Sequence, residues 1–281
     1  MGMKIDGKKI ATTHRENIRA KIDEKTSIGV RNPSMVAVLV GNDGGSISYM
    51  KNQQKLSETL GVKYNSLILD ETITQEELID KIRELNDDNT VDGIILQLPL
   101  PKNFNEKEVT SAICANKDID GLTDINTGRL YKGEKCFIPC TAKSIIELIK
   151  YIENDIKGKN AVVIGRSNIV GKPVAQLLLN ENATVTICHS KTKDLKEVCK
   201  RADILVAAIG KPGFVTKDFV KEGAIVIDVG TTMVDGKIKG DVLYDEVIEV
   251  ASHVSPVPGG VGAMTTTMLL KNTCEAWNKN V

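Results

Sequence analysis

The sequence predicts an α/β protein that contains two βαβ domains with parallel sheets. Three observations predict it. Apolar runs of strand length alternate with stretches of helical period, this rhythm occurs twice along the chain, and the second occurrence opens with a glycine-rich turn between a strand and a helix. Alternation of this kind is typical of parallel sheets covered by helices.

The first series occupies the N-terminal part of the chain. The stretch "SISYMKNQQKLSETLG" (46–61) reads as a helix that ends at Gly61, because glycine is the usual residue after a helix C-terminus. The predicted elements are a strand at 35–41, a helix from about Tyr49 to Leu60, a strand at 62–69, a helix from Thr74 and a strand within 91–101.

A segment without sustained periodicity follows at residues 116–141, and its many turn-forming residues indicate a connection between domains. After it, "AKSIIELIKYIENDI" reads as a helix for which Thr141 is a plausible N-cap. The second series is then predicted as strands at 160–165, 183–189, 203–210 and 223–230, with intervening helices, a hairpin at Asp235-Gly236 and a final helix from about Met264.

Composition restricts the class of protein. The chain has 281 residues, 41% of them hydrophobic and 26% charged, and equal numbers of basic and acidic residues, 37 of each, so no net field favours nucleic acid or an anionic membrane. The N-terminus lacks the apolar core of a signal peptide and no apolar run has the length of a membrane span. Six scattered cysteines favour reduced thiols over a zinc site, so we expect a cytoplasmic protein without a metal.

The turn "VVIGRSNIVGKPVAQLL" has the strand–glycine–helix plan of a phosphate-binding turn. Gly165 ends the strand and Gly171 opens the helix, where free backbone N–H groups attract a pyrophosphate. The spacing of five residues between the glycines differs from the standard dinucleotide fingerprint. On spacing alone, an ordinary turn of an α/β protein is about as good an interpretation.

The end of the next strand favours NADP over NAD. An NAD site usually carries an acid about 20 residues after the glycine turn, on the ribose hydroxyl. Here "TICHSKTK" has no acid before Asp194, whereas Ser190 and Lys191, helped by Arg166, offer a hydroxyl and cations to a 2′-phosphate. The alternative is that His189, Ser190 and Lys191 form a solvated loop.

Five motifs together resemble the methylenetetrahydrofolate dehydrogenase / methenyltetrahydrofolate cyclohydrolase family. They are "DGIILQLPLP" (92–101), "KDIDGL" (117–122), "IPCT" (138–141), "GRSNIVGKP" (165–173) and "PVPGGVGAMT" (256–265). The resemblance implies a catalytic, folate-binding domain at 1–139, joined by the C-terminal helix at 268–281, an NADP-binding Rossmann domain at 140–267, a cleft between them, and a homodimer.

The same resemblance implies the reactions. Methylenetetrahydrofolate would give a hydride to NADP⁺ and form a cationic methenyl compound, and water would then open the methenyl ring to formyltetrahydrofolate. Tetrahydrofolate derivatives are therefore the expected partners in one-carbon metabolism and purine biosynthesis.

The resemblance also implies roles for individual residues. Tyr49 matches a tyrosine that lies against the folate, Gln97 a glutamine beside the catalytic lysine, and Asp120 an aspartate that binds the amino-pyrimidine edge of the pterin. On its own, Asp120 before Gly121 could equally be a turn residue. Substrate contacts are further expected at Pro258, Gly259 and Gly260, and cofactor contacts at Thr141, Gly165, Arg166, Ser167, Gly171, Ser190, Gly210, Gly230 and Thr231.

The chain departs from the family pattern most at position 53. The pattern has its catalytic lysine four residues after the tyrosine, and this chain has Gln53 there. Hydride transfer requires chiefly correct positioning, whereas ring opening requires acid–base catalysis that an amide cannot supply. We therefore expect a dehydrogenase with weakened cyclohydrolase activity. Prolines of the pattern are also replaced, by Ala142 and Ala263.

Alternatives remain at this point. Lys55, or a water held through Gln97, could compensate for Gln53 and preserve both activities. The chain could also be a different two-domain Rossmann oxidoreductase, for example a relative of shikimate dehydrogenase. A folate- or nucleotide-binding regulator without catalysis is the third possibility.

Overall fold

The computed structural model describes residues 2–280 and divides the chain into two compact units, each described by itself below. One unit combines the residues up to Thr13 with Pro139–Thr265, and the other combines His14–Ile138 with the chain from Thr266 onward. Within the described part of the chain, no helix has both the length and the apolar character that crossing a membrane requires.

The unit that contains Pro139–Thr265 is built on a parallel sheet of six strands in the order β1-β11-β8-β7-β5-β6. After β1, the chain returns to the sheet at β5, adds β6 on one side and then crosses to add β7 on the other, so the strand order reverses at β5. The strands are β1 (Met3–Lys4), β5 (Asn160–Ile164), β6 (Thr184–Cys188), β7 (Ile204–Ala207), β8 (Ile225–Asp228) and β11 (His253–Val254).

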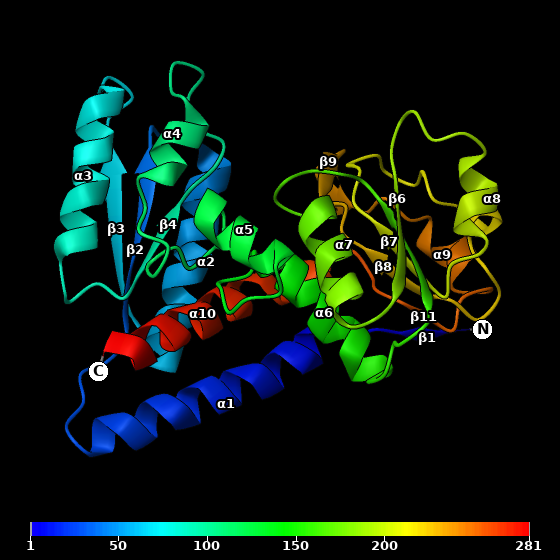
Figure 1. Cartoon of the computed structure of the whole chain (residues 1–281), viewed down its shortest axis with the longest axis horizontal. Coiled ribbons are helices and arrows are strands. Elements are labelled where there is room, and N and C mark those ends of the chain that lie inside the picture. The colour runs from blue at the N-terminus through cyan, green and yellow to red at the C-terminus, as the bar shows by residue number, and fades with distance from the viewer. Residues whose placement is uncertain (1, 281) are drawn as a thin grey trace. The chain divides into compact units, whose positions relative to one another are not determined.

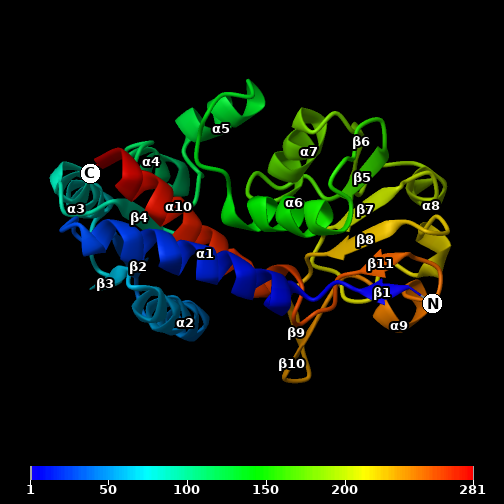
Figure 2. The same ribbon diagram turned by 90° about the horizontal axis from the view of Figure 1, so that it is seen from below.

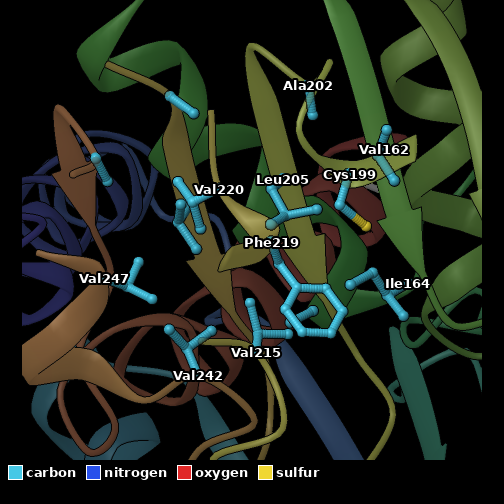
Figure 3. Packing of buried hydrophobic residues seen from close by; sticks show 14 of the residues in the cluster. Val162, Ile164, Cys199, Ala202, Leu205, Val215, Phe219, Val220, Val242 and Val247 are labelled. Carbon is cyan, nitrogen blue, oxygen red and sulfur yellow. The ribbon is translucent and has the colours of Figure 1, made fainter. Parts of the chain in front are cut away.

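Helices cover both faces of this sheet (Figures 1 and 2). On one face lie α6 (Cys140–Ile152) and α7 (Gly171–Asn180), and on the other lie the short helices α8 (Leu195–Cys199) and α9 (Tyr244–Val247). Burial on both sides explains why the inner strands β5, β7 and β8 are almost continuously apolar, whereas most of the edge strand β6 is exposed. Figure 3 shows the core on the α8 side, where the ring of Phe219 packs among aliphatic side chains that include Leu205 and Val215.

A short antiparallel hairpin also belongs to this unit. It joins β9 (Thr232–Val234) to β10 (Lys237–Lys239), and its two turn residues, Asp235 and Gly236, have φ of 51° and 72°. Positive φ at both central residues defines a type I′ turn, which confirms the hairpin predicted at Asp235-Gly236.

The other unit contains a parallel sheet of three strands in the order β3-β2-β4. They are β2 (Ser34–Val40), β3 (Lys63–Leu69) and β4 (Gly93–Leu96), with α2 (Gly44–Leu60) on one face and α3 (Gln75–Asp87) on the other (Figures 1 and 2). All seven residues of β2 are buried, whereas β3 lies at an edge and alternates between exposed and half-buried side chains.

The ends of these helices follow from local sequence. Thr74 caps α3 in a capping box with Glu77, and Asp43 accepts the backbone N–H of Ser46 at the start of α2. Gly61 ends α2 with φ of 79°, as its position in the sequence predicts. The N-cap places the start of α2 five residues before the predicted Tyr49.

Two expectations about elements were wrong. The segment 116–141 is not wholly irregular, because α5 (Asp124–Tyr131) forms within it behind the N-cap Thr123. Thr141 is not an N-cap, since α6 already begins at Cys140 after Pro139. The strand expected within 91–101 is confirmed as the four residues of β4.

Several elements were not predicted. Strand β1 pairs with β11, so the chain starts in the six-stranded sheet and then continues through helix α1 (Gly7–Ser27). The bounds at 139 and 267 that the family resemblance implies for the folate-binding and NADP-binding domains stay a prediction. Helix α4 (Glu106–Ser111) and the 3₁₀ turns Lys217–Phe219 and Val261–Ala263 were not predicted either, whereas α10 (Thr265–Asn280) agrees with the final helix predicted from about Met264.

Candidate functional site

The predicted cofactor residues gather at the carboxyl edge of the six-stranded sheet. The register pairs Ile164 of β5 with Cys188 of β6 on one side and with Ala207 of β7 on the other. Open α/β sheets bind ligands at this edge, where the strand order reverses. The predicted residues that directly follow these strands and β8 are Gly165, Arg166, Ser167, Ser190, Gly210, Gly230 and Thr231.

Gly165 and Gly171 are required by close backbone approaches. A Cβ at Gly165, where φ is 127°, would lie 2.2 Å from the carbonyl oxygen of Ala208, and a Cβ at Gly171 would lie 2.4 Å from that of Gly165. The first turn of α7 is therefore held tightly against the end of β5. Gly165 and Gly171 form a cradle without side chains at the N-terminus of α7. Such a cradle fits the pyrophosphate of a dinucleotide.

Ser167 shapes the same turn. Its Oγ accepts the backbone N–H groups of Val170 and Gly171 at 3.2 and 3.3 Å, and its carbonyl accepts that of Lys172 at 3.0 Å. The hydroxyl thus supports the loop before α7, whose own N-cap residue has no side-chain oxygen.

Arg166 and Ser190 occupy equivalent positions on neighbouring strands. Each stands two residues beyond one member of the Ile164–Cys188 pair, and both side chains are exposed, as is Lys191. The preceding residue, His189, is held locally: its backbone N–H donates to Thr192 Oγ1, and its Nδ1 accepts the backbone N–H of Lys191. The histidine therefore orders this turn.

Two buried carboxylates tie together the loops that carry Gly210 and Gly230. Asp228 accepts the backbone N–H groups of Gly230, Asp241 and Val242, at 2.9, 2.8 and 3.0 Å. Asp241 in turn accepts those of the segment 209–211. Burial, opposed in part by these hydrogen bonds, raises the pKa of Asp228 to about 6. Sequence analysis did not identify this pair.

The two loop glycines have different structural reasons. A Cβ at Gly230 would lie 2.4 Å from the backbone nitrogen of Asp241, so the carboxylate pair requires glycine there. Gly210 has φ of 64° and open space where a side chain would begin. Open space next to the carboxyl edge is compatible with a cofactor at Gly210.

In the other unit, Gln53 is completely buried. It lies on the face of α2 that also buries Met50 and Ser57, while Tyr49, one turn earlier, is 37% exposed. Lys55 is exposed, two residues further along the helix and therefore off this face. The predicted neighbour Gln97 is also buried, and its Nε2 lies 3.4 Å from Oε1 of Gln53.

Tyr64 is a member of this group that sequence analysis missed. Its hydroxyl donates to Oε1 of Gln53 at 3.0 Å, from the edge strand β3. Burial, together with the neighbouring Tyr49, raises the pKa of Tyr64, so this phenol stays protonated at neutral pH. In the sequence, Tyr64 is only a tyrosine near the start of the strand predicted at 62–69, and that signal is too general to identify a site residue.

The turn around Asp120 is built by its neighbour Asp118. The buried carboxylate of Asp118 accepts the backbone N–H groups of Leu122 and Thr123 and the Nδ2 group of Asn126. Half-buried Asp120 follows two residues later. Asp118 therefore accepts the hydrogen bonds that hold this turn.

Helix α10 also supports this turn. Nδ2 of the buried Asn272 donates to the carbonyl oxygen of Ile119 at 2.7 Å and to that of Ile138 at 3.2 Å. A single amide thus holds the backbone immediately before Asp120 and at the end of the segment that follows it.

The predicted substrate loop, Pro258, Gly259 and Gly260, belongs to the unit of the six-stranded sheet. The backbone N–H of Gly260 donates to the carbonyl of Pro256 at 2.8 Å, and Gly259 has φ of 107°. Thr141 lies in the first turn of α6 and is half-buried.

Among residues 2–280, no group of three or more histidine, cysteine or acidic residues is arranged to hold a metal ion.

Two family models match the chain. The catalytic domain of tetrahydrofolate dehydrogenase/cyclohydrolase matches residues 5–120, and the NAD(P)-binding domain of the same family matches residues 139–281. The "Bifunctional protein FolD" of Clostridium novyi is 65% identical over 275 residues, which cover 98% of this chain and 99% of that protein.

Solved structures agree. The bifunctional FolD enzyme of Campylobacter jejuni is 41% identical with a TM-score of 0.97, and all of both chains is covered. The methylenetetrahydrofolate dehydrogenase-cyclohydrolase of Trypanosoma brucei, complexed with NADP and an inhibitor, is 36% identical with a TM-score of 0.93, covering 99% of this chain and 98% of that one. Shikimate dehydrogenase from Aquifex aeolicus, at 16% identity, a TM-score of 0.52, and coverage of 88% of this chain and 92% of that one, shares the fold alone.

Proposed function

The chain belongs to the tetrahydrofolate dehydrogenase/cyclohydrolase family, and from that membership we propose a division of its two activities: an NADP-dependent oxidation of 5,10-methylenetetrahydrofolate that is intact, and a hydrolysis of 5,10-methenyltetrahydrofolate that is weak or absent. The observation that carries the division is Gln53, a buried neutral amide between Tyr49 and Gln97.

NADP is the cofactor that these residues fit, and when bound it accepts the hydride that leaves the methylene carbon. The glycine cradle at Gly165 and Gly171 would hold its pyrophosphate, and Arg166 and Ser190 would bind its 2′-phosphate with a cation and a hydroxyl. The NADP complex of the relative from Trypanosoma brucei supports this choice.

On the folate side, we propose that Tyr49 lies against the substrate and that Asp120 accepts N–H groups of the pterin. A carboxylate can accept two parallel donors and thereby orient a flat heterocycle. The loop of Pro258, Gly259 and Gly260 would cover the bound folate. These contacts position the methylene carbon, and correct positioning is the main requirement for hydride transfer.

Hydrolysis makes a different demand. Water must lose a proton and a ring nitrogen must gain one. Gln53 can neither accept the first proton nor donate the second, because an amide does not titrate near neutral pH. Compensation by Lys55 is disfavoured, since Lys55 is exposed whereas the amide of Gln53 is buried. A neutral side chain at position 53 also adds no like charge near the cationic methenyl product.

The experiment assays both half-reactions on one preparation. We expect reduction of NADP⁺ by methylenetetrahydrofolate, and hydrolysis of methenyltetrahydrofolate near the rate in buffer. Gln53→Lys should raise the hydrolysis by roughly 10²–10⁴-fold, whereas Gln54→Lys, on the exposed side of the same helix, should not. Hydrolysis by the unmodified protein well above the rate in buffer would refute the proposed division of the two activities. Reduction of NAD⁺ in preference to NADP⁺ would refute the cofactor assignment.

We also propose that the protein acts in the cytoplasm as a homodimer. The edge strand β3, with Ile68 55% exposed, offers an uncovered surface for a second copy. Light scattering coupled to size-exclusion chromatography should give twice the 30.6 kDa mass of the chain. A monomer at micromolar concentration would contradict the dimer without affecting the proposed chemistry.

A further inference from the structure

Two neighbouring side chains contact the amide of Gln53. Two donors converge on its Oε1, the hydroxyl of Tyr64 at 3.0 Å and Nε2 of Gln97 at 3.4 Å. If the amide were reversed, its own NH₂ group would face the NH₂ group of Gln97, and two donors cannot pair. With Gln97 oriented as it is, these hydrogen bonds therefore favour the arrangement in which the N–H groups of Gln53 lie at the other end of its amide.

The other end of this amide is one of three buried side-chain polar atoms that have no hydrogen-bond partner among the described residues. Nε2 of Gln53 is enclosed and has no hydrogen-bond partner, while the nearby hydroxyl of Ser57 bonds instead to the Gln53 backbone carbonyl at 2.8 Å. Buried donors are almost always paired, because an unpaired one has lost its bonds to water without a replacement. An acceptor atom that reaches Nε2 would recover this loss.

We propose that Tyr64 is a positioning residue that holds the Gln53 amide so that Nε2 donates a hydrogen bond to an acceptor atom of the reduced folate, a ring nitrogen or a carbonyl oxygen. This inference rests on the dehydrogenase function proposed above and assigns to Gln53 a role within it. The glutamine is then a directed neutral donor for substrate binding that cannot exchange a proton.

The location of the group supports a ligand as the acceptor. Tyr49, proposed to contact the folate, stands one turn before Gln53 on α2 and interacts with Tyr64. Gln97 completes the group from the end of β4. The unpaired donor therefore belongs to a side chain grouped with Tyr49 and Gln97, two residues that the family resemblance assigns to this site.

The inference predicts a particular kinetic change. A hydrogen bond made equally to the bound substrate and to the transition state raises KM when it is lost and leaves kcat unchanged. Gln53→Met keeps the length and burial of the side chain but removes both amide groups, so the KM for methylenetetrahydrofolate should rise about three- to tenfold. Tyr64→Phe frees the amide to rotate and should cause part of the same increase.

The decisive measurement combines the two substitutions. In the Gln53→Met background, Tyr64→Phe should change KM less than twofold, because the tyrosine acts only through the amide. Gln54→Met is the matched control: this neighbouring glutamine is exposed, bonds to Glu58 along the helix, and should leave KM unchanged. Thermal unfolding of each variant establishes that the folded state is retained.

Two results would overturn the inference. One is a KM for Gln53→Met within twofold of that of the unmodified protein, and the other is a Tyr64→Phe effect that persists undiminished when Gln53 is already methionine. Failure of the proposed function would look different, as an unmodified protein that reduces no NADP⁺. In that case, calorimetric titration of the unmodified protein, the two single variants at Gln53 and Tyr64 and their double variant with tetrahydrofolate would still test the donor through the dissociation constant.

Discussion

The carboxylate of Asp118 accepts the backbone N–H of Thr123 at 2.8 Å, and so the first aspartate of "DID" builds the turn that precedes α5. The second aspartate, Asp120, was predicted to bind substrate. Two acidic residues, two positions apart, thus have separable roles that mutation can distinguish.

We expect Asp118→Asn to destabilise the fold by about 1–3 kcal/mol, because an amide NH₂ would face backbone N–H donors in a buried site. Asp120→Asn should raise the KM for methylenetetrahydrofolate about tenfold, since one acceptor for the pterin N–H groups becomes a donor. Urea denaturation and steady-state kinetics measure the two effects. The assignment fails if Asp120→Asn lowers stability while substrate binding is unaffected.

Cofactor selection can be tested at the ends of β5 and β6. Arg166→Ala should raise the KM for NADP⁺ about ten- to hundredfold, and Ser190→Ala about three- to tenfold, because each removes a hydrogen bond to a dianionic phosphate. The KM for NAD⁺, which lacks that phosphate, should not change. Arg201→Ala, an exposed arginine beyond α8, serves as the control. Equal losses with both cofactors would show that these side chains do not read the 2′-phosphate.

Gly165→Ala should be severe. The new Cβ would meet the Ala208 carbonyl oxygen at 2.2 Å, at a φ of 127° that residues other than glycine rarely adopt. We expect a loss of about 2 kcal/mol or more in the free energy of unfolding, together with weaker NADP⁺ binding. Gly128→Ala, at an open position within α5, should change stability by no more than about 1 kcal/mol, in the stabilising direction. A Gly165→Ala protein as stable as the unmodified one would contradict the close approach.

The buried Asp228 predicts a pH dependence of stability. Its pKa is raised from 3.8 to about 6 in the folded protein, chiefly by burial, so the folded state binds the proton more tightly than the unfolded state does. The resulting stabilisation is fully present below about pH 4, decreases as the pH rises towards 6, and is absent above that value. Its size is on the order of 2–3 kcal/mol.

Denaturation with urea between about pH 4 and pH 8 measures this contribution when the protein is compared with Asp228→Asn, which cannot titrate. The stability of the unmodified protein relative to the variant should fall as the pH rises through the window. A difference that stays constant with pH would show that the pKa of Asp228 is not raised.

Local patterns in the sequence account for much of the architecture. The alternation of strands and helices, the end of α2 at Gly61, the type I′ turn at Asp235-Gly236 and the glycine turn between β5 and α7 all depend on residues close together in the chain. The helical period likewise places Gln53 one turn after Tyr49. These features are readable because backbone conformation and side-chain spacing are local properties.

Local signals were less reliable where several of them competed. The N-cap expected at Thr141 was displaced by one that needs no side-chain oxygen, at Pro139, and the polar segment 116–141 concealed the short helix α5. Turn-forming residues are also good N-caps, so composition alone does not separate a connection from a helix start.

What the sequence by itself determined is therefore the family, the two series of parallel strands, the cofactor edge and the presence of a neutral amide at position 53. Only the tertiary structure decided that Tyr64 bonds to that amide, that Asp228 and Asp241 join three loops, and that β1 completes the six-stranded sheet. The physical reason is that each of these depends on contacts between segments that chain topology and close packing bring together, and one chain's residue pattern does not encode such pairings position by position.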